Sequence, residues 1–186
     1  MEKSIREWVS ELSEKDDGVR KTALDKLMAL TEEPIDWIYE FMDELSAKLD
    51  ADNSYQRNIG AMLIASLAKS DSECRLAAVI PRFVKQMDDE KFITARITLQ
   101  HAGRFGAARA AFAAPVAAGL LGALRHNRHL STHGNLIRLD VVNSLREVLG
   151  AYPDAADIQA IHDAISDGCD AKEAMKLFAL LDGRTA

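Results

Sequence analysis

Cysteine is scarce in this sequence, which has Cys74 and Cys169 among 186 residues. A disulfide-stapled fold needs several cysteines, and the usual zinc or redox site needs a CxxC pair that the sequence lacks. We therefore expect two buried thiols in a reducing compartment. The prediction is a cytoplasmic protein without a cofactor.

Long apolar runs are also missing. The longest, around residues 110–124, is rich in Ala and Gly and is interrupted by Pro115, so it makes a poor membrane span. The first fifteen residues are charged and amphipathic and lack the apolar core of a secretory signal. Gly and Pro together number 14, too few for a disordered chain. We expect a folded protein that does not engage a membrane.

No sustained alternation of apolar and polar residues indicates a strand, whereas helical periodicity recurs throughout. Ile5, Trp8, Val9 and Leu12 follow the i, i+3, i+4, i+7 spacing of one helix face. Short polar breaks such as KDDG and DADNS separate similar segments. The pattern predicts about ten helices, at roughly 2–14, 18–31, 35–49, 54–69, 73–87, 91–104, 108–125, 134–149, 154–166 and 171–182.

An internal repeat underlies these helices. Four segments, VRKTALDKLMAL, QRNIGAMLIASL, ARITLQHAGRFG and IRLDVVNSLREVL, each carry Arg in second place, followed by small or apolar residues. These arginines are Arg20, Arg57, Arg96 and Arg138, spaced 37, 39 and 42 residues apart. A period of this length is typical of stacked helix pairs that bury a core only together.

The segment DDGVRKTALDKL, residues 16–27, resembles the HEAT repeat, in which an outer helix, an Asp-rich turn and an inner helix beginning D-x-x-V-R-x-x-A recur. The resemblance covers residues 1–150 well and 151–186 weakly. It implies an all-α, right-handed α-solenoid of about five antiparallel helix pairs, a HEAT/armadillo-like superhelix. We predict one domain, 1–186, with repeats at roughly 2–31, 35–69, 73–106, 108–150 and 154–182.

Most large apolar residues of such a stack serve packing, and Tyr55 and Trp37, near helix starts, are the expected exceptions. In HEAT-like arrays the recurring Arg pairs with turn aspartates of the same or the next repeat. The resemblance therefore implies ion pairs between the four arginines and Asp17, Asp52 and Asp89.

Acidic residues are absent from Lys91 to Leu139, which holds seven Lys or Arg and four of the five histidines. The rest of the chain has 16 basic against 29 acidic residues, so a net charge of −6 conceals a basic middle. Within it, RHNRHLSTHGN (125–135) makes the turn before Arg138 about five residues longer than its equivalents, and such loops often lie on a functional edge. We predict an anion-attracting surface. Its candidate binding residues are Arg104, Arg109, Arg125, His126, Arg128 and His129.

The three histidines of this turn do not suggest a metal site. No carboxylate or thiolate lies near them in sequence, and two arginines accompany them. The HEAT-type deoxyhypusine hydroxylases carry His-Glu pairs as iron ligands, and this sequence has no His-Glu dipeptide. It also has no GxSxG, GxxxxGK[ST], GxGxxG or HExxH motif. We therefore predict neither metal ligands nor catalytic residues.

The leading hypothesis is a non-catalytic scaffold that binds a protein or peptide partner, in particular an acidic one, along the basic middle. A nucleic-acid protein similar to the HEAT-like DNA alkylation-repair glycosylases is the first alternative. A sequence pI near 5.4 and few aromatics in the basic stretch make nucleic-acid binding less favoured. An enzyme subunit like the short HEAT-repeat bilin lyases is the second alternative, and it rests on fold analogy.

Overall fold

A computed structural model describes residues 3–183, which form ten α-helices and no strand. The helices are α1 (Ile5–Glu11), α2 (Asp17–Leu30), α3 (Ile38–Ala47), α4 (Ser54–Leu67), α5 (Ile80–Gln86), α6 (Phe92–Ala108), α7 (Ala110–His126), α8 (Leu130–Ala151), α9 (Ile158–Gly168) and α10 (Ala171–Leu181). Short 3-10 helices occupy Lys48–Asp50, Ala68–Ser70, Arg75–Val79 and Pro153–Ala155. The expected all-helical class is confirmed.

The polar breaks in the sequence supply the N-caps of several helices. Asp16 accepts hydrogen bonds from the backbone N–H groups of Gly18 and Val19 at the start of α2, and Asn53 accepts one from Tyr55 in α4. Asp157 and Asp170 act in the same way in α9 and α10. Such caps satisfy backbone donors that have no partner within the helix. The short acidic turns are therefore helix-start signals.

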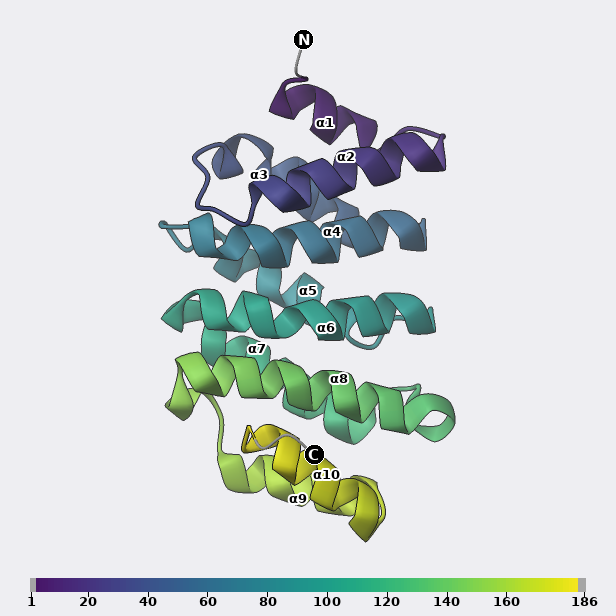
Figure 1. The fold of residues 1–186 in the computed structure, drawn as a ribbon, viewed down its shortest axis with the longest axis vertical. Helices are drawn as coiled ribbons and strands as arrows, with labels where there is room; N and C mark the ends of the chain where they lie inside the picture. The colour runs from purple at the N-terminus through teal and green to yellow at the C-terminus, as the bar shows by residue number, and fades with distance from the viewer. Residues whose placement is uncertain (1–2, 184–186) are drawn as a thin grey trace.

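The helices stack in two layers (Figure 1). α2, α4, α6 and α8 lie side by side in the front layer of this view, which we call the even layer, and each contacts the next. α3, α5 and α7 lie behind it, and α5 packs against α7. α9 and α10 close the C-terminal end against α7 and α8, respectively. One apolar cluster runs through the stack from Val9 to Leu181.

α6 packs closely against α8 at positions where α6 carries glycine. A Cβ atom on Gly103 would lie 2.9 Å from the Cα of Ser144, and one on Gly106 would lie 2.7 Å from a methyl group of Val148. Both distances are shorter than real Cβ contacts allow. The two glycines thus let the backbones of α6 and α8 meet.

The starts of α5, α8 and α9 differ from the prediction by four or more residues. The expected helix 73–87 is α-helical only from Ile80, because Cys74 adopts a left-handed conformation (φ 54°) and Arg75–Val79 forms a 3-10 helix. Pro81 fits the late start, since it lacks an N–H group and is favoured in the first turn of an α-helix, where that group would have no partner within the helix. α8 begins at Leu130, ahead of the expected start at 134, but its uninterrupted part follows a kink at His133 and so starts where the prediction placed it. The expected start at 154 is wrong, because α9 begins at Ile158, after the 3-10 helix Pro153–Ala155.

The predicted long turn is therefore mostly helix. Residues 127–129 separate α7 from α8, and the extra residues form a first turn of α8 that ends in a kink at His133 (φ −138°, ψ 31°). The buried Asn127 fixes this arrangement by donating from Nδ2 to the Met87 carbonyl at 2.6 Å. The turn is thus shaped by its contact with the preceding helix pair.

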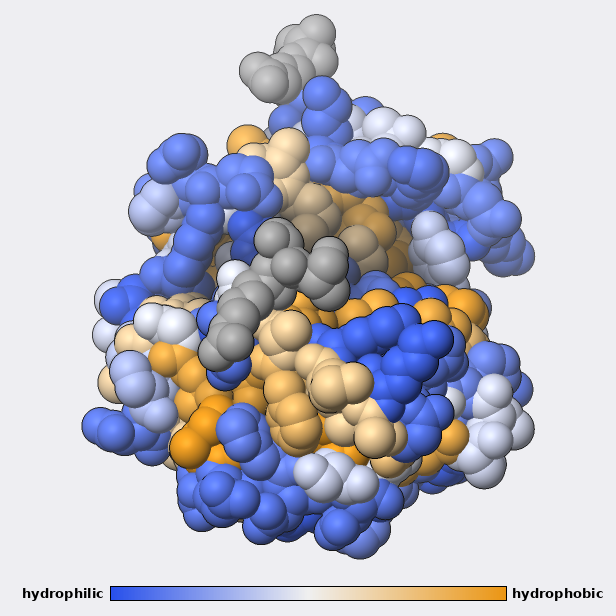
Figure 2. All heavy atoms as spheres, turned by 60° about the horizontal axis from the view of Figure 1, so that its bottom comes forward, coloured by the Kyte–Doolittle hydropathy of each residue, from blue (hydrophilic) through white to orange (hydrophobic). Residues whose placement is uncertain are grey.

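The C-terminal end of the stack retains apolar surface. Figure 2 turns this end toward the viewer and shows apolar areas bordered by hydrophilic residues. Ile158 of α9 and Met175 of α10 are 48% and 66% exposed. The even-layer residues Ile93 and Leu139 are also exposed, so apolar surface is distributed along the stack.

Candidate functional site

The six candidate residues lie in two groups. Arg104 belongs to α6 and Arg109 to the break between α6 and α7, whereas Arg125, His126, Arg128 and His129 surround the end of α7 and the start of α8. Residues 110–124 of α7 separate the groups, about 23 Å at the rise of an α-helix. The structure does not bring them into one compact patch.

The first group is engaged with its own chain. Arg104 donates to the Glu32 carboxylate at 2.9 Å and to the Ser66 hydroxyl at 3.3 Å. The hydrogen bond from Arg104 lowers the pKa of Glu32 below its usual value. Arg109 donates to the Lys69 carbonyl at 2.7 Å. These two arginines link α6 to the segments that follow α2 and α4.

The second group, Arg125, His126, Arg128 and His129, is the basic turn, and it is more open. Arg125 is exposed and donates to the Ala160 carbonyl at 3.3 Å. Arg128 contacts Asp88 twice, through its backbone N–H at 2.7 Å and through Nη2 at 3.2 Å. The side-chain hydrogen bond to Asp88 raises the pKa of Arg128. The Arg128 and Asp88 side chains remain 53% and 42% exposed, so their ion pair is a surface pair.

The three histidines of the stretch 125–135 point to different partners. His126 is exposed, and His129 contacts the Asp89 carbonyl through Nε2 at 2.8 Å. A carbonyl accepts only, so this contact places a proton on Nε2. His133 stacks on Phe92 with ring centroids 4.0 Å apart. Among residues 3–183, no group of three or more His, Cys, Asp and Glu side chains could hold a metal ion.

The recurring arginines connect consecutive helix pairs. Arg57 binds Asp89 through Nε and Nη2 at 2.7 and 2.9 Å, as the ion-pair prediction requires. Arg96 makes the same two-pronged contact with Asp140, at 2.6 and 3.1 Å, and Arg138 makes it with Glu173, at 2.8 and 3.1 Å. These hydrogen bonds raise the pKa values of Arg57 and Arg96.

The first arginine follows a related pattern. Arg20 pairs with Asp17, as predicted, and its guanidinium lies over the Tyr55 ring of the next helix pair, 4.9 Å from the centroid. Its Nη1 also donates to the carbonyls six and five residues earlier, and Arg57 does the same with Ala51 and Asp52. Asp52 therefore contributes its carbonyl to this arginine rather than the expected carboxylate.

Most of the bases in residues 91–139 are paired with acids that lie outside this segment. Within residues 3–183, five of the seven Lys and Arg in this segment pair with carboxylates that lie outside it. These pairs are Lys91–Glu90, Arg96–Asp140, Arg104–Glu32, Arg128–Asp88 and Arg138–Glu173. Bases and acids that are separated along the sequence are therefore largely paired with one another in the folded protein. Among the described residues, Arg109 and Arg125 form no ion pair.

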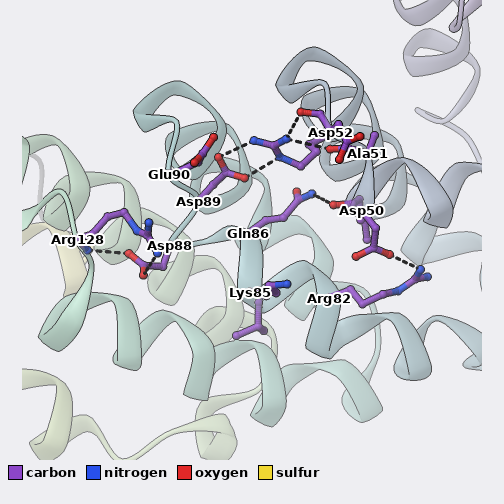
Figure 3. Close-up of a pocket in the computed structure, with 13 residues that line it drawn as sticks. Asp50, Ala51, Asp52, Arg82, Lys85, Gln86, Asp88, Asp89, Glu90 and Arg128 are labelled. Carbon is purple, nitrogen blue, oxygen red and sulfur yellow. Dashed lines mark hydrogen bonds and ion pairs between the residues drawn. The ribbon is translucent and has the colours of Figure 1, made fainter.

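A cleft of about 740 Å³ lies beside the basic turn (Figure 3). The acidic turns after α3 (Asp50–Asp52) and after α5 (Asp88–Glu90) form its walls, with Arg128 at one end. Arg82 of α5 reaches Asp50 at 2.8 Å across it. Neither Arg82 nor Asp50 belongs to the arginine repeat or to the basic middle of the sequence. Their separation of 32 residues, the same as that of Arg57 and Asp89, is a signal that could have found them.

No model of a known protein family, no curated protein and no solved structure matches the chain. In the part of the chain that the structure describes, no helix is both long and apolar enough to cross a membrane.

Proposed function

We propose that this chain is a non-catalytic interaction module, a single-domain, right-handed α-solenoid of HEAT type whose five helix pairs present an extended surface to a protein or peptide partner. Chief support comes from the arginine contacts. Arg57, Arg96 and Arg138 recur at nearly constant spacing, and each binds an acid of the following helix pair. Equivalent contacts between successive units are what a repeat array requires, and they hold its surface rigid.

The basic turn is the part of this surface that would engage the partner. Arg125 is exposed and free of ion pairs among the described residues, and the Arg128–Asp88 pair is solvated. Exposed pairs contribute about 0–1 kcal/mol, so Arg128 can exchange Asp88 for a carboxylate of a partner at little cost. Arg104 and Arg109 are bound to their own chain and would act as supports. The proposed partner is therefore acidic.

The same ion pairs weigh against the nucleic-acid alternative. Tight binding to a nucleic acid draws on many Lys and Arg contacts to phosphates. Five of the seven bases in the middle segment are occupied by carboxylates within residues 3–183. For the bilin-lyase-like alternative, no observation adds support beyond fold analogy.

The test is a titration of a purified partner, obtained by co-purification with the native protein, at about 0.05 M and about 0.5 M salt. Screening of exposed charges should weaken the wild-type complex at the higher salt. Arg125→Glu/Arg128→Glu should lower the association rate at low salt, because such charges steer encounter. Arg6→Glu/Arg75→Glu, which reverses two exposed bases elsewhere, is the control. Equal affinities of the wild type and the turn variant at both salts would refute the acidic-partner proposal.

A further inference from the structure

An apolar groove of about 530 Å³ runs between α5 and α7, in the layer behind the even layer, and ends at the basic turn. Its sides are formed by Ile80, Pro81 and Val84 of α5 and by Pro115, Ala118 and Gly119 of α7. Farther along, Gly122 lies open, since a Cβ atom built there would meet nothing within 4 Å. The groove therefore has room for side chains of another molecule.

The polar lining of this groove is confined to one end. Asp88 follows α5, and His126 and Asn127 end α7, so all three lie where these helices finish. Asp88 is bound by Arg128, and Asn127 by the Met87 carbonyl. His126 is the exposed member of the three.

Two arginines flank this polar end. His126 also lines a neighbouring depression that contains Arg125, while Val84 and Asp88 also line the cleft that contains Arg128. The depression also contains Asp163 and Asp167, and Arg128 is paired with Asp88, so Arg125 is the base at this end that forms no ion pair among the described residues. A ligand lying along the groove would therefore meet apolar surface first and then the exposed guanidinium groups of Arg125 and Arg128. An occupant that is wholly apolar leaves Arg125 without an acidic partner, whereas one that carries a carboxylate can pair with it.

We infer that this groove is the binding site for the partner, and that the bound segment of the partner is a short peptide in which apolar side chains are followed by Asp or Glu. The distance along α7 from Pro115 to His126 is about 16 Å, which an extended segment of about five residues spans. The apolar side chains would fill the space beside Gly122, and the acid would reach Arg125 and Arg128. This inference rests on the proposed function and assigns it a second surface.

The groove can be closed without straining the fold. Gly122→Leu places a side chain in open space and replaces a glycine inside a helix, which favours the helix. Gly150→Leu is the matched control, because Gly150 also lies in a helix, α8, and also has nothing within 4 Å of a built Cβ.

The first measurement uses synthetic fluorescent peptides of three classes: apolar–acidic, apolar–basic and polar–acidic. Fluorescence anisotropy should show that wild type prefers the apolar–acidic class. Gly122→Leu should weaken that binding about tenfold or more, the factor lost when one large apolar side chain is excluded. Gly150→Leu should bind as wild type does. No binding of any class, equal binding of the apolar–basic class, or an unaffected Gly122→Leu protein would overturn the inference.

The second measurement separates this inference from the proposed function and uses the co-purified partner. If Arg125→Glu/Arg128→Glu weakens the partner complex and Gly122→Leu does not, the groove is not the binding site, while the acidic-partner proposal stands. If both variants weaken it, the groove and the turn form one site. If the charge-reversed protein binds the partner as wild type does, the proposed function fails, and this inference fails with it.

Discussion

The Arg57–Asp89 pair shows how one charged contact can join two helix pairs. Its side chains are only 12% and 9% exposed, whereas those of Arg82 and Asp50, in the same cleft, are 39% and 52% exposed. Low exposure reduces solvent screening and makes loss of one partner costly. The two pairs, both 32 residues apart, therefore provide a matched comparison.

We predict that a double-mutant cycle with Arg57→Ala and Asp89→Ala gives a coupling energy of about 1–3 kcal/mol. The corresponding cycle with Arg82→Ala and Asp50→Ala should give less than about 1 kcal/mol. Urea unfolding of the wild type and the single and double variants measures both. Equal coupling energies would contradict the role assigned to the recurring arginine.

His101 gives the stability a specific dependence on pH. Burial lowers the pKa of its imidazole, and Arg104 acts in the same direction, although the hydrogen bond with the Ile97 carbonyl opposes them. Below about pH 6.5, the ordinary pKa of histidine, the unfolded chain then binds more protons than the folded protein. The stability associated with His101 is therefore present above this pH and is lost as the pH falls.

We expect His101→Gln to lose less stability than wild type between about pH 7.5 and about pH 5.5. The difference in slope should not exceed about 1.4 kcal/mol per pH unit, the limit for one proton. Glu147, whose pKa is raised by burial, acts in the opposite direction in both proteins and does not mask the difference. Urea unfolding across this range is the measurement, and identical slopes would contradict the expectation.

At the scale of elements, contact between α6 and α8 depends on Gly103. We predict that Gly103→Ala destabilises the protein by about 1–3 kcal/mol, because the new methyl group would meet the backbone of α8 at Ser144. Gly122→Ala in α7, where the methyl group meets nothing within 4 Å, should instead stabilise it by about 0.5–1 kcal/mol. Thermal unfolding of both variants tests this, and changes of the same sign would count against close packing of α6 on α8.

Apolar periodicity and acidic breaks were sufficient to predict the number of helices and most of their positions, because both are local signals. The first turn of α8, before the kink at His133, could not be predicted in this way, since Asn127 and His129 contact the carbonyls of Met87 and Asp89, 40 residues earlier. The start of α5 was missed although Pro81 carried its signal. At the candidate site, the recurring arginines were visible in the sequence, but two of their partners, Asp140 and Glu173, are helix residues that no turn pattern indicated.

At the scale of the whole molecule, opposite charges that are separated along the chain meet between helix pairs. The acids that neutralise residues 91–139 come from the segment after α2, from the turn after α5, from α8 beyond Arg138 and from α10. Most of these contacts join neighbouring units, as the apolar contacts of the even layer do. Stability should accordingly depend on how many neighbours a helix has.

This dependence predicts a gradient of local stability along the stack. α4 packs between α2 and α6, α6 between α4 and α8, and α8 between α6 and α10. α1 and α10 lie at the two ends of the stack. In a stack held by nearest-neighbour contacts, terminal units open with less free energy than central ones. Native-state hydrogen exchange read by mass spectrometry should therefore show the slowest amides in α4, α6 and α8 and faster exchange in α1 and α10.

A variant tests whether the units can open separately. Asp140→Asn, which weakens the contact of Arg96 in α6 with α8, should accelerate exchange in α8 and α10 more than in α2. Uniform protection from α1 to α10, changing equally everywhere in the variant, would show that the chain opens as one unit and that the helix pairs are not separable.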